Sequence, residues 1–264
     1  ISFFDDHRKS FFFMLFLVIV MIITAAVGFK FVQRFISVPY FTKTLSAVKI
    51  EDAELSISRA LVLNSNDLYF RTYAQVYLLK LNQIVSKDAD SLNDEDKTNL
   101  QVSLDQAVNG AQLAINYNNK NYLNHQMLCS VYQTAGFIGV KDAYPKALEA
   151  YKKASELNPA NPRLKLVLAS VSSALESKKD ARDYANQALT LKPDYIDAFV
   201  TLSQIANIEG KTNEAIEYAQ KALALSPGNK DLIQYVESLR NGTAAPVIPT
   251  APAEDTTINT PTDQ

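Results

Sequence analysis

Three segments of this sequence match one another at a constant interval of 34 residues. They are ALEAYKKASELNP (147–159), ARDYANQALTLKP (181–193) and AIEYAQKALALSP (215–227). Two alanines and a proline hold the same places in each segment: Ala147, Ala181 and Ala215, then Ala154, Ala188 and Ala222, then Pro159, Pro193 and Pro227. Self-similarity at a fixed period of this length is the signature of a chain built from stacked copies of one structural unit.

Each matched segment has the pattern of the second helix of a helical hairpin. Its two alanines lie seven residues apart and therefore on one face, where they let a neighbouring helix approach closely. The proline ends that helix and precedes the next one. Hairpins of this kind stack into a curved solenoid, so the sequence predicts an all-α fold.

This arrangement resembles the tetratricopeptide repeat. The segment NHQMLCSVYQTAG (124–136) keeps the register of that family's first helix, with His125 at the place of its Trp and Tyr132 at the place of its Tyr. Cys129 stands where the family has a small residue. The resemblance implies that His125 and Cys129 are packing residues, and that the chain binds or scaffolds other molecules.

Less regular copies of the unit precede the three matched segments. Segments 53–65 and 107–119 keep the alanine register, but extra residues separate them from the next unit. The predicted organisation is a polar flank at 1–9, a transmembrane helix at 10–29, an interfacial linker at 30–50, two degenerate repeats at 51–119 with a polar insertion near 86–99, three repeats at 120–227, a capping helix at 228–241 and a disordered Pro/Thr-rich tail at 242–264.

The stretch 10–29 contains 20 residues without a charge. A helix of this length is about 30 Å long, which is enough to cross the hydrocarbon layer of a membrane. We therefore expect membrane lipid to contact residues 10–29 and the chain to span a bacterial cell membrane once. Most of the nearby basic residues follow the segment (Lys30, Arg34, Lys43 and Lys49), which favours a cytoplasmic location for the repeats.

Residues that carry catalytic or metal chemistry are scarce. The chain has two histidines, one cysteine and no phosphate-binding glycine loop, so we predict no catalytic residue, no metal and no cofactor. A net charge of −2 and the lack of a basic face argue against a nucleic-acid partner. The chain is therefore expected not to be an enzyme.

In a solenoid of this type the first helices line a concave face, which is the expected place for a protein or peptide partner or for a glycan. The residues predicted on that face are Gln126, Ser130, Gln133, Arg163, Leu166, Ser170, Asp197, Val200, Gln204 and Asn207. This face is polar and carries few charges. The alternative is a rigid spacer whose groove binds nothing specific.

The layout also resembles the C-terminal region of bacterial polytopic O-antigen ligases or polymerases that end in tetratricopeptide repeats. The similar segments are 40–47 (YFTKTLSA), 71–78 (RTYAQVYL), 124–132, 147–166 and 189–199. The resemblance implies that any catalytic part lies upstream of Ile1, and the absence of an initial methionine agrees with a piece of a longer protein. Two functions stay open: a membrane-anchored interaction module, or the tail of a glycan-transferring enzyme.

Overall fold

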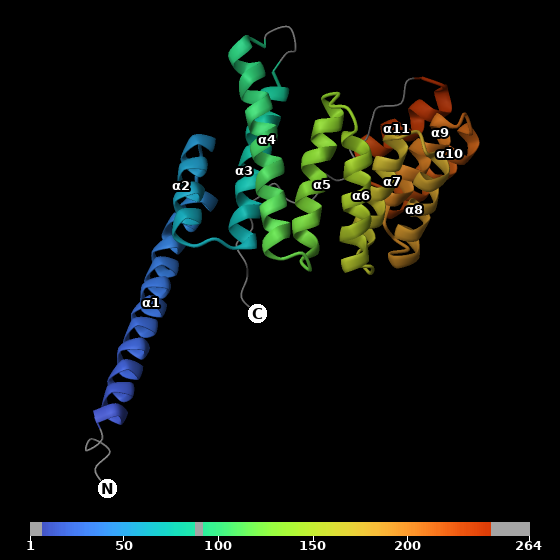
Figure 1. The fold of residues 1–264 in the computed structure, drawn as a ribbon. Helices are drawn as coiled ribbons and strands as arrows, with labels where there is room; N and C mark the ends of the chain where they lie inside the picture. The colour runs from blue at the N-terminus through green and yellow to red at the C-terminus, as the bar shows by residue number, and fades with distance from the viewer. Residues whose placement is uncertain (1–6, 88–91, 244–264) are drawn as a thin grey trace.

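The computed structural model describes residues 7–87 and 92–243. Over these residues the chain forms eleven α-helices and no strand: α1 (His7–Leu45), α2 (Ile50–Leu63), α3 (Asp67–Val85), α4 (Asp94–Tyr117), α5 (Tyr122–Phe137), α6 (Ala143–Leu157), α7 (Pro162–Ala174), α8 (Lys178–Leu191), α9 (Ile196–Ile208), α10 (Thr212–Leu225) and α11 (Lys230–Asn241). Helices α2 to α11 stack into a curved array, and α1 projects from it (Figure 1). The predicted all-α solenoid with an N-terminal apolar helix is confirmed. Most of the predicted flank (1–9) and nearly all of the predicted tail (242–264) lie outside the described residues.

Helix α1 is one continuous helix of 39 residues. The stretch 30–50, predicted as a linker, is helical as far as Leu45 and packs on the solenoid. Its Phe41 ring stacks on Tyr69 with a centroid distance of 4.5 Å, and the Ser37 hydroxyl lies 3.3 Å from the Tyr69 hydroxyl. Helix α1 therefore serves both as the apolar segment and as the first helix of the first hairpin.

Consecutive helices pair into hairpins: α1 with α2, α3 with α4, α5 with α6, α7 with α8, and α9 with α10. All six register alanines, which are Ala147, Ala154, Ala181, Ala188, Ala215 and Ala222, are fully buried between helices. Helices α6, α8 and α10 each end two residues before their register proline. The small side chains thus lie at the helix contacts, and the prolines lie in the turns.

Asparagine side chains fix where several helices begin. Asn66, Asn121, Asn161 and Asn229 precede α3, α5, α7 and α11, and each side chain accepts a hydrogen bond from a backbone N–H of the first turn. The distances lie between 2.9 and 3.2 Å. Each cap of this type contributes about 1 kcal/mol, because it satisfies a donor that the helix itself leaves free.

The extra residues of the irregular repeats are mostly helical. Helices α3 and α4 have 19 and 24 residues, compared with 13 and 14 in the α7–α8 hairpin. The predicted insertion at 86–99 therefore includes the first turns of α4, which start at a capping box formed by Asn93 and Asp96. Figure 1 shows the α3–α4 hairpin reaching beyond its neighbours.

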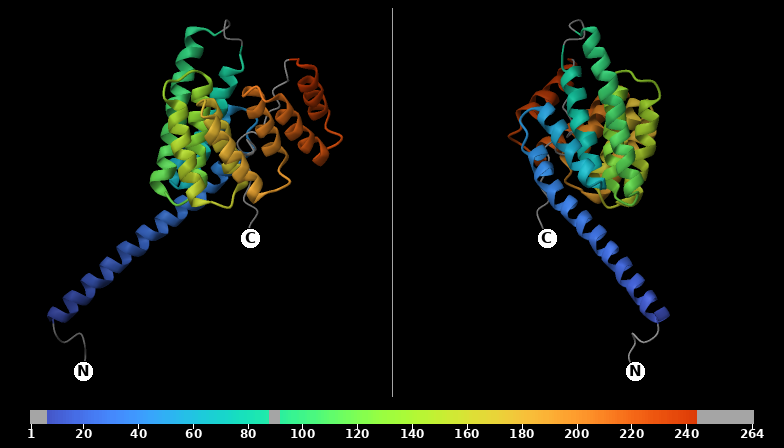
Figure 2. Two further views of the ribbon diagram at one scale, coloured as in Figure 1. Left: turned by 90° about the vertical axis from the view of Figure 1, so that its right-hand side faces the viewer. Right: turned by 60° about the vertical axis from the view of Figure 1, so that its left-hand side comes forward.

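Two pairs of first helices also contact each other across neighbouring hairpins. Helix α3 contacts α5, and α7 contacts α9. In the described part of the chain, consecutive second helices do not contact each other to the same extent. Figure 2 shows the hairpins following a curved path. Helix α11 closes the far end, burying Leu232, Tyr235, Val236 and Leu239 and exposing Lys230, Asp231, Gln234, Glu237 and Arg240.

Candidate binding surfaces

Seven of the ten predicted groove residues are at least partly exposed, and their place in a groove stays a prediction. Asn207 is exposed, and six others are half-buried: Ser130, Gln133, Arg163, Ser170, Asp197 and Gln204. They come from three first helices, α5, α7 and α9. The inner surface is defined here as these seven residues. Its chemistry is that of amides, hydroxyls and two opposite charges.

The other three predicted groove residues are buried and cannot touch a partner. Leu166 packs against Ala188 and Ala198, which come from the next two helices. Val200 packs in the same way against Ala222 and Leu232. Gln126 is buried as well. Leu166 and Val200 therefore belong to the joints between successive hairpins, and the assignment of these three buried residues to an open groove was wrong.

The charged residues of the inner surface lie in a partly desolvated setting. Burial raises the pKa of Asp197 above its ordinary value of 3.8, and the charges of Arg163 and Lys192 offset this only in part. The Lys192 ammonium lies 5.0 Å from the centre of the Tyr195 ring. A carboxylate whose charged form is disfavoured gains from a cationic or N–H donor of a partner, which is typical of a recognition site.

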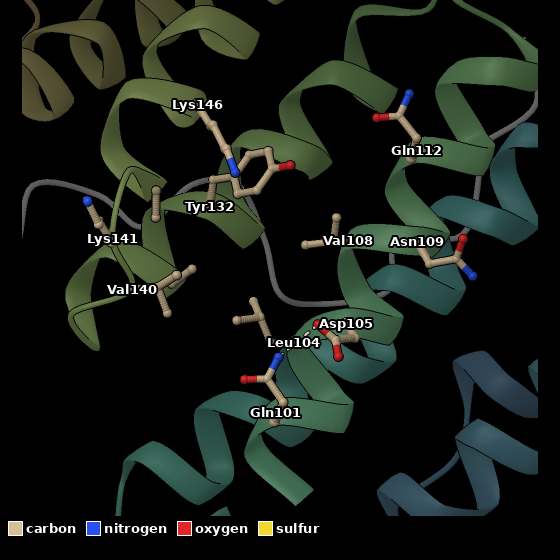
Figure 3. Close-up of a pocket in the computed structure, with 12 residues that line it drawn as sticks. Gln101, Leu104, Asp105, Val108, Asn109, Gln112, Tyr132, Val140, Lys141 and Lys146 are labelled. Carbon is tan, nitrogen blue, oxygen red and sulfur yellow. Dashed lines mark hydrogen bonds between the residues drawn. The ribbon is translucent and has the colours of Figure 1, made fainter. Parts of the chain in front are cut away.

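A separate hollow of about 520 Å³ lies between α4 and the α5–α6 hairpin (Figure 3). Polar α4 side chains form one wall, and Lys141 and Lys146 lie on the opposite side. The Lys146 ammonium lies 5.7 Å from the centre of the Tyr132 ring, which also lines the hollow. None of the ten predicted groove residues lines this hollow, so sequence reasoning missed it.

The origin of this hollow can be traced to the irregular spacing of its repeats. Helix α5 has 16 residues where α7 and α9 have 13, and five residues connect α5 to α6. The longer connection brings Val140 and Lys141 to the edge of the hollow. The interval of 40 residues between Asn119 and Pro159 was therefore the sequence signal that could have indicated it.

A polar cluster at the joint between the second and third hairpins was also missed. The Asp67 carboxylate accepts hydrogen bonds from the side-chain amides of Asn118, Asn121 and Asn124, at 3.3, 2.9 and 3.1 Å. The Arg71 guanidinium donates to the side-chain Oδ1 of Asn124 at 2.8 Å. Burial alone would raise the pKa of Asp67, but the amide donors and the charge of Arg71 lower it below 3.8. Because these groups satisfy one another, the cluster joins hairpins.

His125 and Cys129 occupy the interior. A His125 ring nitrogen lies 2.9 Å from the Asn119 carbonyl, and the Cys129 thiol donates to the His125 carbonyl at 2.8 Å. Burial raises the pKa of the Cys129 thiol well above its ordinary value. Within the described ranges, no group of three or more His, Cys, Asp or Glu residues is placed to hold a metal ion.

Comparison with known proteins identifies the repeat. The family model of the tetratricopeptide repeat matches residues 196–229. Cellulose synthase operon protein C of Pseudomonas fluorescens is 31% identical over 99 residues, which cover 38% of this chain and 8% of that protein. A small glutamine-rich tetratricopeptide repeat-containing protein of Mycosarcoma maydis is 34% identical over 102 residues, which cover 39% of this chain and 27% of that protein. The chain thus spans less than a third of these relatives.

Solved structures show the same fold. A tetratricopeptide repeat protein from Parabacteroides merdae has a TM-score of 0.59 at 15% identity, covering 78% of this chain and 72% of that one. A thermophilic tetratricopeptide repeat protein from Thermus thermophilus has a TM-score of 0.55 at 19% identity, covering 80% of this chain and 99% of that one. YrrB, a tetratricopeptide repeat protein described as having an unusual peptide-binding site, has a TM-score of 0.52 at 18% identity. The match covers 75% of this chain and 90% of YrrB.

The described residues therefore form a tetratricopeptide-type solenoid, preceded by one helix long and apolar enough to cross a membrane. Neither of these two relatives is named as an O-antigen ligase. That resemblance rests on the sequence segments alone.

Proposed function

We propose that this chain is a membrane-held interaction module that binds an extended segment of a partner protein along its inner surface. The observation that carries the proposal is that three consecutive first helices each present half-buried polar side chains, with Arg163 on α7 and Asp197 one repeat further on α9. A repeated set of amides, hydroxyls and opposite charges suits the repeating donors and acceptors of an extended peptide backbone.

Two further observations support a peptide as the ligand. One fold neighbour, YrrB, is described as having a peptide-binding site. In addition, the inner surface is polar and only partly exposed, so a bound segment would gain hydrogen bonds in a setting where water competes less. A glycan could use the same groups, and it stays a prediction from the sequence.

Helix α1 supports the membrane part of the proposal. It contains a window of 18 residues with a mean hydropathy of 2.8, none of which is buried against the rest of the chain. Because an apolar helix of this length satisfies its own backbone hydrogen bonds, it is stable in lipid. A bacterial cell membrane, with the repeats on the cytoplasmic side, remains the predicted location.

Site-specific photo-crosslinking in native membranes tests the inner surface. We expect a photo-reactive amino acid at Ser170 or Gln204 to capture a partner protein, followed by its identification by mass spectrometry. The matched controls are Asp183 and Glu217, which are exposed on the second helices α8 and α10. Equal capture from both pairs would reject a specific groove, and capture from neither pair would favour the rigid spacer.

Charge reversal provides an independent test. Asp197→Arg or Arg163→Glu should reduce partner recovery in a pull-down, because each change places like charges on the inner surface. Asp183→Arg, on an exposed second-helix position, should leave recovery unchanged. Circular dichroism should show the same helix content for all variants. Unchanged recovery with Asp197→Arg would show that the partner binds elsewhere on the chain.

A further inference from the structure

The second helix of the first hairpin has an unusual outer face. Leu55 and Val62 on α2 are 51% and 85% exposed. At the place of Leu55 the other second helices carry exposed polar residues, which are Asn109, Glu149, Asp183 and Glu217. At the place of Val62 they carry Asn116, Glu156, Thr190 and Ala224. At these two positions α2 is therefore more apolar than the other second helices.

Helix α1 also exposes apolar side chains close to the first hairpin. Beyond residue 29 the helix buries Ser37, Phe41 and Thr44 against the solenoid, yet Phe31 and Phe35 are both 71% exposed. From Ser10 to Val38 a helix rises about 42 Å. This length matches a bilayer with its two headgroup regions, at about 40–45 Å, and exceeds the hydrocarbon layer of about 30 Å.

The end of α2 lies level with this part of α1. The two helices run antiparallel, and the Arg59 guanidinium lies 5.9 Å from the centre of the Tyr40 ring. Val62 follows Arg59 by about one helical turn, in the direction of the apolar segment, so it reaches the height of residues 36 and 37 of α1. Phe31, Phe35 and Val62, defined here as the membrane-proximal patch, therefore lie at one end of the first hairpin.

We propose that the headgroup layer of the bilayer covers the membrane-proximal patch, so that the first hairpin is seated in the membrane surface. The inference rests on the proposed membrane anchoring and adds a second helix to it. Phe31 follows the apolar segment by two residues, and burial in lipid removes apolar side chains from water. Lys30 and Arg34, which alternate with the phenylalanines of the patch, can extend their charged ends to lipid phosphates.

Tryptophan fluorescence gives a direct test, because the chain contains no tryptophan. The full chain is reconstituted into vesicles of phosphatidylcholine and phosphatidylglycerol, with and without brominated acyl chains. Three variants each carry one tryptophan: Val62→Trp in the patch, Phe16→Trp in the apolar segment, and Thr190→Trp at the place on α8 that matches Val62. We expect brominated lipid to quench Phe16→Trp strongly and Val62→Trp measurably, and to leave Thr190→Trp unchanged. The Thr190→Trp control shows whether a tryptophan alone draws this fold onto lipid.

Three results would overturn the inference in distinguishable ways. An unquenched Val62→Trp that emits at the wavelength of Thr190→Trp would place the patch in water. A blue-shifted but unquenched Val62→Trp would show that a protein, such as a second copy of this chain, covers the patch. An unquenched Phe16→Trp would reject the membrane anchor itself. Because Val62 is largely exposed, circular dichroism should confirm an unchanged fold for its variant.

Discussion

Two aspartates of the solenoid lie in environments that shift their pKa values in opposite directions. Asp67 accepts three amide hydrogen bonds, which favour its charged form and lower its pKa. Burial disfavours the charged form of Asp197 and raises its pKa. A group whose pKa differs between the folded and unfolded states makes stability depend on pH, so the two residues contribute with opposite signs.

We expect Asp67→Asn to lower the free energy of unfolding at neutral pH and Asp197→Asn to raise it. The stabilisation from Asp67 is complete above its ordinary pKa of 3.8 and disappears as the pH falls through its lower folded value. Charged Asp197 is penalised at neutral pH, and the penalty decreases as the pH falls through its raised folded value. Urea unfolding in detergent, followed by circular dichroism, measures the free energy of unfolding of both variants as a function of pH. A shift of the same sign for both variants would contradict this assignment.

The proposed binding role of Asp197 can be compared with its effect on stability. If Asp197→Asn is more stable but recovers less partner in the pull-down, the chain retains a disfavoured charge for recognition.

Cys129 should be unreactive in the folded chain. Its side chain is fully buried, its thiol donates to the His125 carbonyl, and burial raises its pKa, so little thiolate is present at neutral pH. We expect a maleimide to label the wild-type chain only after denaturant is added. Lys179→Cys, at an exposed position of α8, is the positive control and should react at once. Rapid labelling of the folded wild-type chain would mean that α5 opens readily.

At the scale of single helices, the sequence predicted the second helices well and the first helices less well. Alanines must recur where second helices touch their neighbours, and this requirement shows directly in the spacing of Ala154, Ala188 and Ala222. Contact surfaces of the first helices are less restricted. Leu166 and Val200 fit an inner position by register, but the register does not say how far the next hairpin covers them.

The contact between α3 and α4 depends on a glycine. A Cβ atom at Gly110 would lie 2.8 Å from a Tyr73 ring carbon and 3.1 Å from the backbone nitrogen of Ala74. Alanine within a helix normally stabilises by about 1 kcal/mol relative to glycine. Here we expect the clash to prevail, because the backbone of α3 would have to move.

Gly110→Ala should therefore lower the free energy of unfolding by about 1–3 kcal/mol, as overpacked cores do. Gly228→Ala is the control, since nothing lies within 4 Å of its added Cβ. Thermal unfolding followed by circular dichroism compares the two. A Gly110→Ala chain as stable as the wild type would show that α3 and α4 are not closely packed at this point.

At the scale of the whole molecule, the continuity of α1 was the main feature that the sequence did not reveal. Pro39 and the mixed polar and apolar residues around it are typical of a break between an anchor and a domain. Pro39 lies instead on an exposed side of the helix, while Ser37, Phe41 and Thr44 are held by the first hairpin. Tertiary packing thus maintains a helix that local preference disfavours, at a site where a proline usually costs about 3 kcal/mol.

A continuous α1 has a mechanical consequence, because a rigid helix transmits its length to the domain that it carries. Seven alanines inserted between Phe31 and Val32 add about two turns, which should move the solenoid about 10 Å along the helix axis with little rotation. Energy transfer from a donor dye on Lys179→Cys to acceptor-labelled lipids measures this displacement, and the unreactive Cys129 allows the dye to be placed selectively.

The matched control inserts a flexible Gly/Ser segment of the same length at the same point. We expect the alanine insertion to lower the transfer efficiency as a lengthened rod would, and the flexible insertion to broaden the distances. If both insertions give the same transfer, α1 does not act as a rigid connection. The proposed membrane anchor would then not fix the orientation of the solenoid.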